Sequence, residues 1–176
     1  RVDRRQRQMC IRDSGKGGGA YYALQYGGGN ITTTTGNVLI QANQTGTEIG
    51  VYFSSNPTNI TTNGGSVTVN GTAASRFGIY NDVAVNINTS QGSGGITLTG
   101  NSTSHLGVFI NALTNLVSGA GDINVTGTSG SGTDQGVYIY SGNITTTTGN
   151  ITLTGTSNGT GYAGFDYARD TSIGSI

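Results

Sequence analysis

The fold of this chain is decided by the stretch GNITTTTGNITLTGTS, residues 142–157. Its first nine letters, GNITTTTGN, also occur unchanged at residues 29–37, which is 113 residues earlier. An identical copy at this distance predicts several shorter repeats between the two. The residues around each Gly-rich turn define the period.

Three columns of apolar residues give that period. In each column the residues recur at intervals of 27 to 29 along the chain, and a quarter of 113 is about 28. The columns are Ile31, Ile60, Ile87, Leu116 and Ile144; Val38, Val67, Ile96, Ile123 and Ile151; and Val51, Ile79, Val108, Val137 and Phe165. The sequence therefore predicts about five repeats of about 28 residues.

Short runs with alternating character surround these columns. The segments VTV (67–69), ITL (96–98) and INV (123–125) have aliphatic flanks and a polar centre, which is typical of half-buried strands. Clusters of Gly, Asn and Ser separate the runs and supply turns. No segment has the spacing of an amphipathic helix, so we expect three short strands per repeat.

The column alignment favours a solenoid over other repeat folds. Equivalent residues of coils that stack directly lie about 4.8 Å apart, so similar side chains meet along the axis. A propeller blade needs four strands and about 40 residues or more. We predict an all-β, single-stranded parallel β-helix with three short strands per coil, about five coils and a length of about 24 Å.

Composition excludes some function classes. The 176 residues include 32 Gly, carry 9% charged residues and have a net charge of zero. A nucleic-acid partner would require a basic patch, which this composition does not supply. No apolar run approaches the roughly 18 residues of a membrane-spanning helix, so the chain is not expected to span a membrane.

The first fourteen residues differ from the rest. RVDRRQRQMCIRDS (1–14) holds five of the eight basic residues and the only Met and Cys, and it resembles a translated sequencing-adapter read-through. We predict a non-native or disordered segment over 1–14 and a solenoid fragment of a longer protein over 15–176. The solenoid then has three basic and six acidic residues, a net charge of −3 and no Cys.

The repeats also carry a family resemblance. The strings GVYI (136–139), SGNITTTTGN (141–150) and GNITLTGTS (149–157) resemble repeats of filamentous-haemagglutinin-type adhesins and autotransporter passengers, and the likeness runs from Gly19 onward. It implies a right-handed coil and a shaft segment whose coils continue in the same chain. It also implies a secreted or surface location at the outer membrane of a Gram-negative bacterium, an outer-membrane transporter during export, and a host-cell or matrix glycan or protein as partner.

The titratable residues do not form a catalytic pattern. The carboxylates after residue 14 are Glu48, Asp82, Asp122, Asp134, Asp166 and Asp170. Glu48 and Asp134 share one position in the repeat but lie three coils, or about 14 Å, apart, whereas a glycosidase pair needs roughly 5 to 9.5 Å. His105 is interpreted as an isolated surface residue with no His, Cys or carboxylate in phase. We predict no catalytic, cofactor or metal site, and no enzyme.

One outward column is a candidate surface. Tyr52, Tyr80, Phe109 and Tyr138 occupy the middle of the second strand in successive coils, and Asp166 follows them. An acidic residue in the same column indicates that the column faces outward. We expect a stacked aromatic stripe that either stabilises the solenoid or binds a glycan or a partner protein.

Outward threonines are the other candidate surface. The pairs Thr97 with Thr99 and Thr152 with Thr154 are typical of ice-binding solenoids, but Leu39 with Gln41, Thr68 with Asn70, and Asn124 with Thr126 interrupt the array in three of five coils. Ice binding is therefore the least favoured function. The first expectation is a structural adhesin shaft that projects a binding region. The alternative is a glycan-binding or glycan-processing β-helix that uses the aromatic face.

Overall fold

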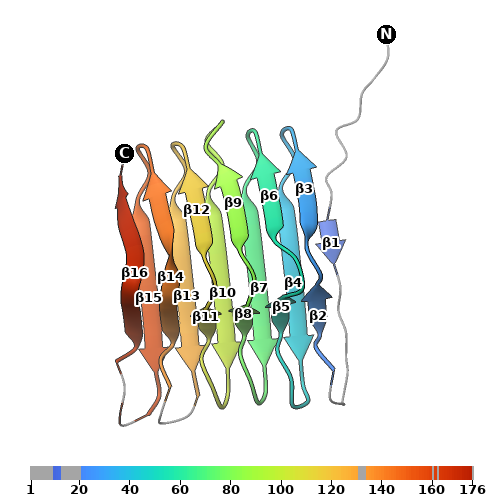
Figure 1. Ribbon diagram of the computed structural model, residues 1–176, viewed down its shortest axis with the longest axis vertical. Coiled ribbons are helices and arrows are strands. Elements are labelled where there is room, and N and C mark those ends of the chain that lie inside the picture. Colours follow the sequence, from blue (N-terminus) through green and yellow to red (C-terminus); the bar gives the residue numbers. More distant parts are fainter. Residues whose placement is uncertain (1–9, 13–20, 131–133, 160, 162, 176) are drawn as a thin grey trace.

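The protein is a β-solenoid, seen here in a computed structural model that describes residues 10–12, 21–130, 134–159, 161 and 163–175. These residues form sixteen strands and no helix. All pairings between the strands are parallel, and each coil contributes three strands before the chain returns to its starting position one level further along (Figure 1). The predicted fold class, the repeat of about 28 residues and the number of coils are confirmed.

A six-stranded sheet forms one wall of the solenoid. Its members pair in the order β1-β4-β7-β10-β13-β15. From β4 onward each strand is seven residues long and follows its neighbour without a register shift. The strands are β1 (Cys10–Arg12), β4 (Val38–Gln44), β7 (Val67–Ala73), β10 (Ile96–Ser102), β13 (Ile123–Ser129) and β15 (Ile151–Ser157).

The opposite wall consists of two columns of shorter strands. The long strand β14 (Val137–Thr146) belongs to both columns and joins them into one ten-stranded sheet, and β16 (Phe165–Ser175) pairs with it. One column holds β2 (Leu24–Tyr26), β5 (Val51–Phe53), β8 (Ile79–Asn81) and β11 (Val108–Ile110). The other holds β3 (Gly29–Thr33), β6 (Thr58–Thr62), β9 (Val85–Thr89) and β12 (Thr114–Ser118).

The core lies between the two walls and is built from the predicted columns. Ile60, Val67 and Val108 are fully buried, and their equivalents in neighbouring coils pair with them residue for residue. Burial at about 25 cal/mol per Å² of apolar surface drives this packing. Because each coil covers the next, the stacking buries side chains that a single coil would leave exposed.

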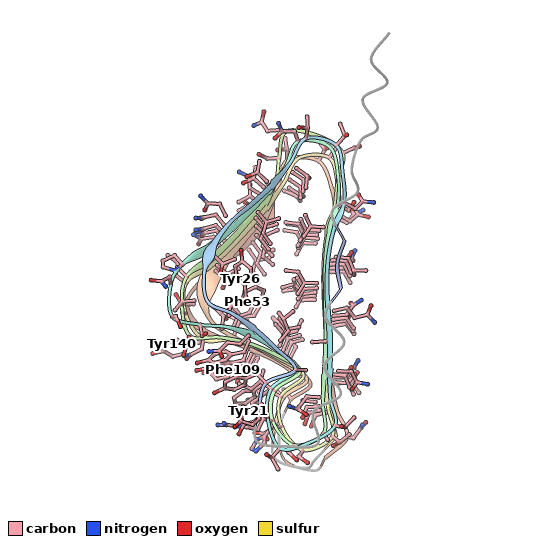
Figure 2. The ribbon with its side chains drawn as sticks, turned by 90° about the vertical axis from the view of Figure 1, so that its right-hand side faces the viewer. Tyr21, Tyr26, Phe53, Phe109 and Tyr140 are labelled. Carbon is pink, nitrogen blue, oxygen red and sulfur yellow. The ribbon has the colours of Figure 1, made fainter. Side chains whose placement is uncertain are left out.

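Glycines narrow each coil at a waist. Gly71, Gly100, Gly127 and Gly155 lie in the long strands, and each faces a second glycine seven to nine residues later. A Cβ on Gly71, for example, would collide with the carbonyl oxygen of Gly78. The waist separates the main core from a small lobe formed by the intervening residues, such as 72–77, and creates a concave notch on the outer surface (Figure 2).

Buried and partly buried hydroxyl groups close the turns at the other end of the coil. Thr33 donates to the carbonyl oxygen of Gly36 at 2.6 Å, and Thr89 donates to that of Gly94 at the same distance. Ser118 donates to Thr146 Oγ1 at 2.9 Å in the next coil. These bonds satisfy polar groups that burial would otherwise leave unpaired.

Asn81 is a polar exception inside an apolar column. It pairs with Phe53 and Ile110 but is itself buried. Its amide nitrogen donates to the carbonyl oxygens of Val83 and Ala112 and to Thr114 Oγ1, and its oxygen accepts from the backbone of Asn111. This set of bonds joins two coils and fixes their corner.

The N-terminal segment is described over three residues only. Cys10–Arg12 pair in parallel with Leu39–Gln41 of β4. The rest of segment 1–14 lies outside the described residues, so the predicted boundary between residues 14 and 15 stays a prediction.

Candidate functional site: the stacked aromatic column

The predicted aromatic residues form a continuous stack. Tyr52, Tyr80, Phe109 and Tyr138 are the central residues of β5, β8, β11 and the start of β14, and they pair with one another in register. Their neighbours along each strand are buried while the rings are half-exposed, so the column faces outward as predicted. Asp166 pairs with Tyr138 and continues the column, as expected.

The rings stack face to face along the solenoid axis. Tyr52 and Tyr80 have centroids 5.4 Å apart at an interplanar angle of 16°, and Phe109 and Tyr138 lie 5.4 Å apart at 18°. Tyr80 and Phe109 are tilted by 33° at 5.3 Å. The faces of the rings therefore cover one another, and the ring edges face solvent. Offset stacks of this kind are favourable arrangements of aromatic quadrupoles.

Two further aromatic residues join the stack from other positions. The ring centroid of Tyr22 lies 4.7 Å from that of Tyr52, although the residue that pairs with Tyr52 in the sheet is Gln25. The ring centroid of Phe77, from the small lobe, lies 5.0 Å from that of Tyr80 and 5.4 Å from that of Phe109. Neither is predicted from the sequence, because both lie three residues before the position that Tyr52, Tyr80, Phe109 and Tyr138 occupy in the repeat. We call Tyr22, Tyr52, Tyr80, Phe109 and Tyr138 the aromatic column.

The column occupies the notch beside the glycine waist. Figure 2 places Phe109 on the outer side of the wall, in the concave region between the main core and the small lobe. Phe77 closes over two of the rings from the small-lobe side. The aromatic column and Phe77 thus form a small hydrophobic cluster on the outer side of the sheet.

Polar groups meet the ring edges. The Tyr52 hydroxyl donates a short hydrogen bond to Asp82 Oδ2, and this bond, with burial and the Asp82 charge, raises the pKa of Tyr52 well above its ordinary value. Asn111 donates to the Tyr80 hydroxyl at 3.2 Å. Burial first, and then the charge of Asp82, also raises the pKa of Tyr80.

A column of ionisable side chains runs beside the rings, and one contact in it corrects a prediction. His105 is not isolated, because its Nδ1 lies 2.9 Å from Asp134 Oδ2. Arg76 pairs with Glu48 at 3.2 Å. These four residues recur every 28 or 29 positions, so the spacing alone puts Glu48, Arg76, His105 and Asp134 in one phase. The interpretation of His105 as isolated was wrong, because Asp134 occupies the same position in the next repeat.

The other described carboxylates also have partners. Asp122 accepts from the backbone and side chain of Asn150, and Asp166 accepts from Gln135. In the predicted in-phase pair, Glu48 contacts Arg76 and Asp134 contacts His105. Within the described part of the chain, no group of three or more His, Cys, Asp or Glu residues is arranged to hold a metal ion.

An asparagine ladder on another face was not predicted. Asn59 donates to Asn30 at 2.9 Å, Asn86 to Asn59 at 2.9 Å, Asn115 to Asn86 at 2.6 Å and Asn143 to Asn115 at 3.0 Å. The spacing of 27 to 29 residues would have revealed it. An open polar groove runs beside it, lined by Asn30, Thr32, Asn59, Thr61, Asn86 and Asn88.

The core contains a small cavity. It holds about 20 Å³ and is lined mainly by apolar side chains from three coils, among them Phe53, Ile79, Leu98 and Ile110. This volume is near that of a single water molecule, so the cavity has no room for an organic ligand. Over the described residues, no helix has the length and apolar character needed to cross a membrane.

No protein-family model, curated protein or solved structure matches this chain. Its own geometry therefore carries any proposal about function.

Proposed function

We propose that this chain is a structural shaft segment of a secreted or cell-surface bacterial adhesin. The observation that supports the proposal is the stacking of five coils, in register except for one shift between β14 and β16, in which core, aromatic column and asparagine ladder all run along one axis. A shaft needs length and stiffness, and each coil adds about 4.8 Å of hydrogen-bonded sheet. An outer-membrane transporter during export and a Gram-negative surface location belong to this proposal.

The arrangement of the rings favours a shaft over a glycan platform. A sugar ring packs against the exposed face of an aromatic ring, but here the faces of Tyr80 and Phe109 are covered by their stacked neighbours. Phe77 adds a second cover from the side. The column then contributes stability, at about 0.5 to 1.5 kcal/mol for each ring pair beyond burial.

A glycan-binding surface remains the second candidate function. The observation in its favour is the row of polar groups along the ring edges, where Asp82, Asn111 and the tyrosine hydroxyls lie together. Glycan arrays and host cells separate the two functions. We expect the full chain to show no saturable binding, and single Ala substitutions at Tyr52, Tyr80 and Tyr138 to leave this binding result unchanged. Binding that all three substitutions abolish would establish the glycan surface instead.

Projection itself is tested by displaying the chain on a bacterial surface with a reporter epitope at its far end. Deleting residues 67–95 removes one whole coil and joins positions that are equivalent, because Val67 pairs with Ile96. The epitope should stay accessible to antibody. Deleting residues 67–80 removes half a coil and should abolish display through misfolding. Equal accessibility of both deletion variants would overturn the shaft proposal.

A further inference from the structure

The outer face of the six-stranded sheet carries a regular array of small uncharged side chains. In β7, β10, β13 and β15 three positions per strand point outward, alternating with buried or inward ones. Nine of these twelve positions are Thr and three are Asn. In strand order they are Thr68, Asn70 and Thr72; Thr97, Thr99 and Asn101; Asn124, Thr126 and Thr128; and Thr152, Thr154 and Thr156.

This threonine face is more complete than the paired threonines of the sequence suggest. The third outward position follows a waist glycine and adds Thr72, Thr128 and Thr156 to the face, with Asn101 at the same place in β10. Asn124, Asn70 and Asn101 are the first, second and third outward residues of their respective strands, so no position along the strands lacks Thr in more than one coil. Each replaces Thr with another small neutral polar residue. Leu39 and Gln41 lie in β4, at one edge of the face.

The face is flat and its rows are in register. Thr99 pairs with Thr126, and Thr126 pairs with Thr154, with no shift along any of the four strands. Successive coils superpose along the straight wall opposite the labelled aromatic residues in Figure 2. Rows about 4.8 Å apart and outward residues about 6.7 Å apart along each strand give a nearly rectangular net. These spacings are close to the repeats of oxygen atoms on prism faces of ice.

The side chains of the face are free to order water. Within the described residues, none of the twelve side chains makes a hydrogen bond to another protein group, unlike the asparagine ladder on the other wall. Threonine is branched at Cβ, so its χ1 angle is restricted and its methyl and hydroxyl groups repeat with little freedom to lose. An ordered layer of water over such a net therefore costs little side-chain entropy.

Charge selects the kind of ligand. The Glu48–Arg76 salt bridge and the His105–Asp134 contact lie in the small lobe, not on the threonine face. The face also has none of the Trp, Tyr or Arg anchors that dominate protein interfaces. A neutral, regular ligand without charge or exposed apolar groups is the electrostatic match. We propose that the threonine face binds ice, a function beyond that of a shaft.

The test uses the purified full chain and single ice crystals grown in its solution. We expect it to shape the crystals into facets and to be enriched in slowly grown ice. Thr126→Arg, at the centre of the face, should abolish both effects. Thr126→Val keeps a methyl group and the shape of threonine and should retain faceting. Thr61→Arg, an outward residue of β6 on the other wall, is the matched control and should behave like the unchanged chain.

Circular dichroism must show that all variants are folded. Round, unfaceted crystals with the unchanged chain would overturn the inference, as would an equal loss of activity in Thr126→Arg and Thr61→Arg. Sedimentation provides the remaining readout. A dimer that Thr126→Arg alone dissociates would assign the face to a second copy of the chain and would also overturn ice binding. None of these results bears on the shaft, which is tested by display.

Discussion

Gly107 lies directly against Gly100 across the waist of the third complete coil. A Cβ added to Gly107 would stand 2.5 Å from the carbonyl oxygen of Gly100 and closer still to the backbone nitrogen of Thr128 in the next coil. Backbone on both sides cannot move aside as a flexible side chain would. The waist therefore requires the absence of a side chain, whatever backbone angles the position adopts.

Substituting Gly107→Ala should lower the free energy of unfolding by about 3 kcal/mol, because the added methyl group overpacks two strands of backbone. Gly64→Ala is the matched control, since its nearest contact would be an ordinary 3.8 Å to Thr34. Urea denaturation followed by circular dichroism measures both. Similar midpoints for the two variants would contradict a steric role for the waist.

Phe109→Ala should destabilise the solenoid by about 2 to 4 kcal/mol, because Phe109 contacts Phe77, Tyr80 and Tyr138 at 5.3 to 5.4 Å. Tyr140→Ala removes an aromatic ring that is 52% exposed and should stay within about 0.5 kcal/mol of the unchanged chain. Thermal and urea unfolding give the comparison. A loss at position 140 as large as that at 109 would mean that stacking is not what stabilises the notch.

The asparagine ladder has a direction that aspartate substitutions can reveal. Asn86 donates to Asn59 and accepts from Asn115, whereas Asn30 at the end of the ladder only accepts from Asn59. Asn86→Asp removes a donor and should cost about 1 kcal/mol at neutral pH. Asn30→Asp keeps an acceptor and should cost less. The ladder is refuted as a directional element if the two variants unfold at the same urea concentration.

Alkaline pH should act on the Tyr52–Asp82 contact. The hydrogen bond to Asp82 raises the pKa of Tyr52, so the folded chain holds this proton more tightly than the unfolded chain. The resulting stability is fully present below the unfolded pKa of about 10 and declines as pH rises above it. Tyr52→Phe should therefore lose less stability than the unchanged chain between about pH 9 and about pH 11.

Asp82→Asn provides the complementary measurement. Removing the carboxylate charge should lower the pKa of Tyr52 toward the ordinary value, which moves the last part of the phenolate absorbance titration to lower pH. An unchanged titration curve would show that Asp82 does not set the pKa of Tyr52.

Periodicity made much of this structure predictable. Because coils stack in parallel and in register, residues one period apart become neighbours, and the arithmetic that aligned Val67 with Ile96 also aligned Tyr52 with Tyr80. The same repeat spacing predicts the pairing of His105 with Asp134 and the asparagine ladder through Asn86. Those two features were within reach of the sequence, provided that residues of different types are compared at one phase.

The sequence by itself determined what meets along the axis: the strands, their register, the core columns and the outward aromatic residues. Only the tertiary structure decided what meets across a coil. The contact between Gly100 and Gly107, the approach of Phe77 to Phe109 and the entry of Tyr22 into the stack depend on how each turn folds back. Stacking repeats one spacing, whereas the path within a coil follows from steric fit that no period encodes.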